Sequence, residues 1–138
     1  MAKWMWKGYF QAEIPDDWTV NESSDLIEML PPRPVGALQI SFFKVPDGEP
    51  EKRCKEAISN FVEKQGGQAC GEFLVERRDS VLSVSSTFGS RISGKDLFWL
   101  ISAIGLPGMI ALVTYCYGGQ RDDEVRRAVE IIRSISPA

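Results

Sequence analysis

Side chains that could support acid–base or nucleophilic chemistry are scarce in this sequence. Its 138 residues include no histidine, which is the commonest general base and metal ligand near neutral pH and the partner of most serine and cysteine nucleophiles. Carboxylate pairs occur at Asp16-Asp17 and Asp122-Asp123, and two carboxylates can carry glycoside hydrolysis. The first pair falls in an expected turn and the second at an expected helix start, so we interpret both as solvated cap residues. We therefore expect a protein that is not an enzyme.

Cysteine is the remaining candidate for nucleophilic or metal chemistry. The three cysteines, Cys54, Cys70 and Cys116, are far apart and form no CxxC pair, which excludes the usual zinc and redox spacings. Cys54 falls on the apolar stripe of an expected helix and Cys116 within an apolar strand, so we expect both to be reduced core residues. The glycine pairs at 66–67 and 118–119 lie outside any Walker or dinucleotide pattern. We expect no cofactor and no metal.

Recognition of a partner is the chemistry that the sequence favours instead. Trp4 and Trp6 precede the first confident strand and would share one face of an extended segment. Two interpretations stay open: the two rings anchor a protein partner or the second subunit of a homodimer, or they extend that strand over the core. Arg33, in the proline-rich turn at residues 31–34, is a further candidate contact. Trp4, Trp6 and Arg33 are thus the expected partner-binding residues.

The charge pattern gives no sign of binding to nucleic acid or to a membrane. Acidic and basic residues are interleaved and the formal net charge is only −3, whereas binding to nucleic acid or an anionic membrane requires a basic patch. Near the N-terminus, Lys7 and Gly8 interrupt the apolar core that a secretory peptide needs. Together with the three unpaired cysteines, this predicts a cytoplasmic protein whose partner is another protein of unknown identity.

The elements that must position these residues follow from hydrophobic periodicity. With 43% apolar and 25% charged residues, the chain has the balance of one globular domain, residues 1–138. Alternation with a period of two predicts strands, and the segments concerned are residues 8–14, 37–44, 70–77 and 81–88, with shorter ones at 18–20 and 25–30.

Two segments have the period of an amphipathic helix instead. The first begins near Pro50, ends at the glycines of residues 66–67, and repeats apolar residues from Cys54 to Val62 at helical spacing. The second begins with the acidic residues 122–124, which suit a helix dipole, and carries Val125, Ala128, Val129 and Ile132 on one stripe. We expect these helices to cover a sheet.

Residues 97–117 form an uncharged segment that is long enough to cross a bilayer, but residues 105–108 (Gly-Leu-Pro-Gly) interrupt it. A spanning helix needs about 20 unbroken apolar residues. Two apolar runs around a Gly/Pro turn instead predict an antiparallel hairpin, entered through a loop at residues 89–95. Because its strands are apolar on both faces, we expect the hairpin at the middle of the sheet. A re-entrant membrane hairpin is the weaker alternative.

The segment GYFQAEIPDDWTV at residues 8–20 resembles the opening of the PsbP-like superfamily, where an aromatic strand ends in a proline-x-x-Trp turn, here Pro15 to Trp18. The expected order of elements is also similar. That superfamily includes photosystem-associated proteins, a Ran-binding nuclear-transport factor, DcrB-type lipoproteins and chaperones encoded beside secreted effectors. The resemblance implies an α/β/α sandwich, and binding rather than catalysis. Unlike the lumenal and lipoprotein members, this chain shows no signal or lipidation cysteine near its start.

The expected fold is therefore α+β, an antiparallel sheet of about six to seven strands flanked by helices. The expected function is a non-enzymatic, cytoplasmic protein-interaction module, such as an adaptor, assembly factor or effector-associated chaperone, that uses one sheet face or its aromatic N-terminus to hold a protein segment. The alternative is a small-ligand-binding domain, or an unrecognised enzyme, with a cavity between sheet and helix lined by aromatic residues such as Trp18 and Trp99.

Overall fold

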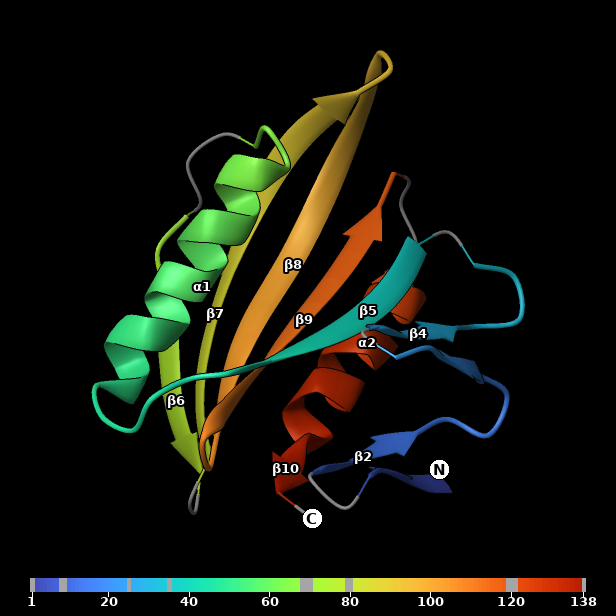
Figure 1. The fold of residues 1–138 in the computed structure, drawn as a ribbon. Coiled ribbons are helices and arrows are strands. Elements are labelled where there is room, and N and C mark those ends of the chain that lie inside the picture. Colours follow the sequence, from blue (N-terminus) through green and yellow to red (C-terminus); the bar gives the residue numbers. More distant parts are fainter. Residues whose placement is uncertain are drawn as a thin grey trace.

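The chain folds into an antiparallel α+β structure with two sheets and two helices (Figure 1). The structure, a computed structural model, describes residues 2–7, 10–24, 26–34, 36–67, 71–78, 81–118 and 122–137. Within these ranges the elements are β1 Ala2–Trp6, β2 Phe10–Ile14, β3 Thr19–Glu22, β4 Leu26–Leu30, β5 Gly36–Lys44, α1 Pro50–Lys64, β6 Leu74–Arg78, β7 Val81–Ile92, β8 Lys95–Leu106, β9 Met109–Tyr117, α2 Asp122–Ser134 and β10 Ser136–Pro137.

The larger sheet has seven strands in the order β3-β4-β5-β9-β8-β7-β6. Its centre is the β8–β9 hairpin, in which Phe98 pairs with Tyr117 and Leu106 with Met109. The expectation of a central hairpin, apolar on both faces, is confirmed. Strands buried on both sides must be apolar throughout, and residues 110–115 of β9 are all buried.

Two expectations about the turns of this sheet are wrong. The β8–β9 turn is made by Pro107 and Gly108 alone, because Gly105 and Leu106 still pair within the hairpin; proline fixes its own φ and Gly108 adopts φ +70°, as in a type II turn. The loop expected at residues 89–95 is also absent, since β7 and β8 stay paired up to Ile92 and Lys95. Ser93 and Gly94, both with positive φ, close that hairpin.

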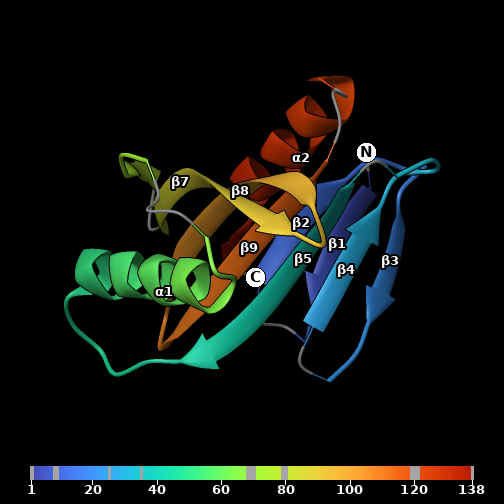
Figure 2. The ribbon, with the colours of Figure 1, turned by 90° about the horizontal axis from the view of Figure 1, so that it is seen from above.

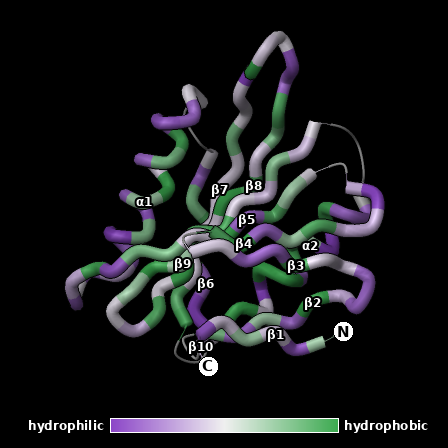
Figure 3. The backbone as a smooth tube through the Cα atoms, turned by 45° about the vertical axis from the view of Figure 1, so that its right-hand side comes forward, coloured by the Kyte–Doolittle hydropathy of each residue, from purple (hydrophilic) through white to green (hydrophobic). Residues whose placement is uncertain are grey.

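One face of the large sheet is covered by α1. The buried side chains Cys54, Ile58 and Val62 of the helix pack against Val84, Phe88, Trp99, Ile101, Ala103, Ile110 and Leu112 of β7 to β9. In Figure 3 the helix alternates between hydrophilic and hydrophobic segments, as an amphipathic helix must. Figure 2 shows α1 and α2 on opposite sides of these strands.

The other face is shared by α2 and a second, three-stranded sheet of order β1-β2-β10. One core forms between α2, the small sheet and this face of the large sheet. It contains Ala128, Ile131 and Ile132 of α2, Ile135 just after it, Phe10, Ala12 and Ile14 of β2, Leu38 and Ile40 of β5, and Val113 and Tyr115 of β9. Segments near the two ends of the sequence lie side by side here, because Gln11 of β2 pairs with Ser136 of β10. This small sheet was not expected from the sequence. Its strand β10 has two residues, too few for a periodic signal.

Candidate functional site

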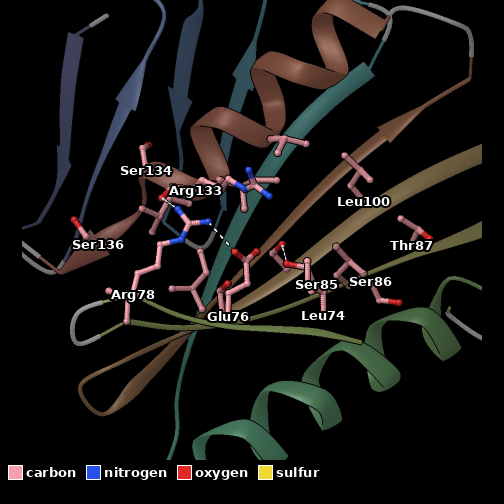
Figure 4. Close-up of a pocket in the computed structure, with 18 of the residues that line it drawn as sticks. Leu74, Glu76, Arg78, Ser85, Ser86, Thr87, Leu100, Arg133, Ser134 and Ser136 are labelled. Carbon is pink, nitrogen blue, oxygen red and sulfur yellow. Dashed lines mark hydrogen bonds and ion pairs between the residues drawn. The ribbon is translucent and has the colours of Figure 1, made fainter. Parts of the chain in front are cut away.

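A groove lies between α2 and the strands β6, β7 and β8 of the large sheet. It has a volume of about 410 Å3 and is lined by residues of these four elements, by Glu72 before β6 and by Ile135 and Ser136 after α2 (Figure 4). We call it the α2 groove. The groove exists because α2 and the small sheet cover only part of this sheet face, namely β5, β9 and the end of β8 at Ile104 and Leu106. The part of the face toward the edge strand β6 stays open.

Hydroxyl groups form the floor of the α2 groove. Ser83, Ser85 and Thr87 alternate along one face of β7, and Ser102 of β8 lies opposite Ser85. The Oγ atoms of Ser85 and Ser102 are 2.6 Å apart, so one of the two hydroxyls donates a hydrogen bond to the other. The floor therefore offers hydrogen-bonding groups between apolar walls.

Apolar side chains from both sides form the walls. Leu100 and Ile104 rise from β8, Val129 and Ile132 from α2, and Leu74 from β6. Leu74 is 55% exposed, which is unusual for a leucine beside a core and marks the open side of the groove. The arrangement is typical of binding sites, in which mostly apolar walls are combined with a few placed polar groups.

One end of the α2 groove is charged. An Arg78 Nη2 atom lies 3.2 Å from Glu76 Oε2, and Nη1 of the same guanidinium donates a hydrogen bond of 3.3 Å to the carbonyl oxygen of Arg133. The Arg133 side chain also lines the groove. Arg78 thus links the β6 wall to the C-terminal turn of α2, as the dashed lines of Figure 4 show.

The residues expected to bind a partner do not lie in this groove. Trp6 is 8% exposed and its ring stacks on Phe42 with centroids 4.2 Å apart. Trp4 is half-buried, with its ring edge-on to Phe10. The structure places Trp6 in the core, so the interpretation of the pair as a surface anchor does not fit that residue. The two rings do not extend the first expected strand either, because β1 is a separate strand that pairs antiparallel with β2.

Arg33 lies elsewhere again. It is exposed and lines a smaller cavity of about 280 Å3 together with Trp18 and Arg127. Trp18 is buried, and its Nε1 atom has no hydrogen-bond partner among the described residues. Trp99 is buried against α1, where its Nε1 donates a 2.8 Å hydrogen bond to Ser90 Oγ. The α2 groove is thus lined by neither Trp18 nor Trp99, whereas the smaller cavity has Trp18 and residues of α2 in its lining.

The cysteines fit structural positions. Cys54 is fully buried, and burial raises the pKa of its thiol to about 11, while burial also raises the pKa of the half-buried Cys116. A thiol held in its neutral form is a poor nucleophile. Cys70 lies outside the described residues. In the described ranges, no three His, Cys, Asp or Glu side chains gather closely enough to hold a metal ion.

The sequence contained one signal for the groove. The alternation of Ser83, Ser85 and Thr87 showed that one face of β7 is polar, but that pattern is the same for a solvated face and for a groove floor. The wall supplied by α2 comes from residues about fifty positions later, which no local pattern reveals.

As to membranes, neither helix, over the part of the chain that the structure describes, is long and apolar enough to cross a bilayer.

Comparison with known proteins identifies structures of similar fold only. No protein-family model and no curated protein matches the chain. A protein of Bacteroides thetaiotaomicron VPI-5482 is similar in structure, with a TM-score of 0.67 and 16% identity over 99% of this chain and 48% of its own. This chain therefore spans about half the length of that protein.

Two further structures cover more of their own length. LpqN of Mycobacterium tuberculosis, described as involved in cell envelope biogenesis, has a TM-score of 0.63 and 15% identity over 94% of this chain and 83% of its own. PA94 of Pseudomonas aeruginosa, a protein of unknown function, has a TM-score of 0.59 and 17% identity over 94% of both chains. At such identities the similarity shows a shared α+β fold.

Proposed function

We propose that this chain is a non-enzymatic protein-interaction module that holds a segment of another protein in the α2 groove. The observation that supports this is the open sheet face itself, with Leu74 exposed on one wall and Val129 and Ile132 on the other. From Glu72 to Arg78 the β6 side of the groove extends for about 20 Å at roughly 3.3 Å per residue. A segment of about six extended residues fits that length.

We infer the functional class, the cellular compartment and the detailed fold from the sequence and from the packing of the helices. The absence of histidine favours binding over catalysis, and the reduced state expected for the cysteines favours the cytoplasm. We also infer that the fold is the α/β/α sandwich of the PsbP-like superfamily, with the small sheet added beside α2; the packing of α1 and α2 on opposite sides of the large sheet supports this inference. A homodimer stays a prediction, which light scattering coupled to size exclusion tests.

Site-specific photo-crosslinking tests the proposed groove. A benzoylphenylalanine residue at Leu74 should crosslink a partner protein in cells, whereas the same residue at Glu56, exposed on α1, should not. The Leu74 crosslink should also disappear when Ser85→Trp fills the groove floor, and should persist with Ser59→Trp on α1, provided that circular dichroism shows both variants folded. Equal crosslinking at Leu74 and Glu56, or a Leu74 crosslink that survives Ser85→Trp, would contradict the proposal.

A small-ligand-binding function is the second candidate, and the groove volume is the observation that favours it. About 410 Å3 lies within the range of roughly 300–1,000 Å3 that small-molecule sites occupy. Native mass spectrometry of the purified protein distinguishes the two functions. A bound small molecule, absent from the Ser85→Trp variant, would favour this candidate over the protein segment.

A further inference from the structure

Charges are distributed unevenly along the α2 groove. At one end, Glu72 and Thr87 line the groove, and the backbone carbonyl oxygen of Glu72 accepts a 3.3 Å hydrogen bond from the Ser86 hydroxyl. At the other end lie Arg78 and Arg133. The groove is thus acidic at the Thr87 end and basic at the end where α2 terminates.

The basic end holds more positive than negative charge among the residues that line it. Two guanidinium groups, those of Arg78 and Arg133, lie there, and Glu76 supplies a carboxylate that pairs with Arg78. The side chain of Arg78 is 46% exposed, so its guanidinium still presents N–H groups to a bound molecule. Arginine presents five donors in a planar fork that binds carboxylates in a bidentate manner.

Next to these cations lie apolar surfaces. Ile132 on α2 and Ile104 on β8 line the same groove as Arg78, and hydroxyl groups lie between them. A ligand that matches this lining has apolar side chains along most of its length and a carboxylate at one end. Charge complementarity of this kind contributes mainly to specificity and to the register of binding.

We propose that the segment held in the α2 groove is apolar and carries an aspartate or glutamate, whose carboxylate lies between Arg78 and Arg133. This inference rests on the proposed function and specifies its partner. The carboxylate fixes the direction of the segment, because the opposite end of the groove presents Glu72 and repels a second acidic residue. A basic residue of the partner is favoured at that end.

Peptide selection tests the inference while the partner itself is unidentified. A display library of random 12-residue peptides is selected on the wild-type protein and counter-selected on the Ser85→Trp variant. Peptides that depend on the groove should be enriched in apolar residues and should contain Asp or Glu at one constant position. Chosen peptides are then synthesised with a fluorescent label, and their affinity is measured by anisotropy.

Charge reversal identifies the contact. Arg78→Glu should weaken binding of such a peptide about tenfold, and replacing the peptide's acidic residue by lysine should restore it. Arg133→Glu, which keeps the backbone carbonyl that Arg78 contacts, is the second variant in case Arg78→Glu unfolds the β6 edge. Arg91→Glu is the matched control, because Arg91 is exposed on the β7–β8 hairpin and pairs with Asp96 outside the groove, and it should leave the affinity unchanged.

The outcomes separate this inference from the function on which it rests. Groove-dependent peptides without a conserved acidic residue, or with a basic residue in its place, would overturn the inference and leave the proposed function standing. Equal effects of Arg78→Glu and Arg91→Glu would overturn it too. If every selected peptide binds the Ser85→Trp variant as well as the wild type, the proposed function fails together with the inference.

Discussion

At the scale of single residues, Gly36 is the position where the backbone leaves no space for a side chain. A Cβ atom there would lie 2.3 Å from the carbonyl oxygen of Cys116 and 2.9 Å from the ring of Tyr115. We expect Gly36→Ala to lower the free energy of unfolding by about 1–3 kcal/mol, which is the usual cost of overpacking. Urea denaturation measures this loss. Gly89→Ala is the matched control, because its Cβ would meet only the Leu97 carbonyl at 3.8 Å; an equal loss in both variants would contradict the steric explanation.

The carboxylate of Glu124 connects three elements at the same place. Glu124 is 2% exposed, and its Oε2 accepts hydrogen bonds from the Tyr115 hydroxyl and from the Gly36 amide, the latter at 2.9 Å. Hydrogen bonds to a charged group contribute about 1.5–3 kcal/mol each, so we expect Tyr115→Phe to lower the free energy of unfolding by that amount. Tyr117→Phe, the next tyrosine on this face of β9, should cost much less; similar losses would argue against the Glu124 contact.

At the scale of elements, the β7–β8 turn is not optimised. Ser93 has φ +53° and Gly94 φ +78°, and a two-residue turn with two positive φ angles prefers Asn-Gly. Since asparagine adopts left-handed backbone angles more readily than serine, Ser93→Asn should raise the free energy of unfolding by about 0.5–1 kcal/mol. Ser59→Asn on α1, where no positive φ is needed, is the control. A gain that is equal in both variants would contradict the turn argument.

The packing of α1 on the sheet predicts a pH effect through Cys54. Burial raises its pKa from 9.0 to about 11, so between these values the unfolded chain releases the thiol proton while the folded chain keeps it. Stability from this group is therefore complete below pH 9 and is lost as the pH rises toward 11. Above pH 9, the free energy of unfolding should therefore fall less steeply with pH in Cys54→Ala than in the wild type. Denaturation at several pH values measures this slope. Unchanged slopes would show that Cys54 does not titrate in this way.

At the scale of the whole molecule, strand order predicts where the fold is most stable. β8 and β9 pair on both sides, and residues 99–106 of β8 and 110–115 of β9 are largely buried, whereas β3 and β6 lie at the two edges of the sheet. Amide hydrogens of the central hairpin should exchange only through global unfolding, on the order of a hundredfold or more slower than those of the edges. Hydrogen exchange followed by mass spectrometry measures this. Faster exchange in β8 than in β6 would contradict the hierarchy.

Local sequence patterns were sufficient to predict both helices and most of the strands, because those properties depend on the side chains of neighbouring residues, but they missed β10, the separate strand β1 and the paired ends of β7 and β8. The apolar residues 97–117 and their Gly/Pro turn required a central hairpin, and the spacing from Cys54 to Val62 required α1. The turn boundary was missed because the sequence does not distinguish a glycine within a strand from a glycine within a turn, and Gly105 pairs with Leu82 and Ile110 inside the sheet.

The positions of Trp6 and Arg33 and the opening of the α2 groove depended on contacts between distant segments. Trp6 became a core residue because β1 pairs with β2, and β2 with β10 at the far end of the chain. The groove required α2 to pack beside β8, with Arg78 reaching the carbonyl of Arg133, residues that are 55 positions apart. Such contacts depend on how separate elements pack, and hydrophobic periodicity records which face of an element is buried but not which element covers it.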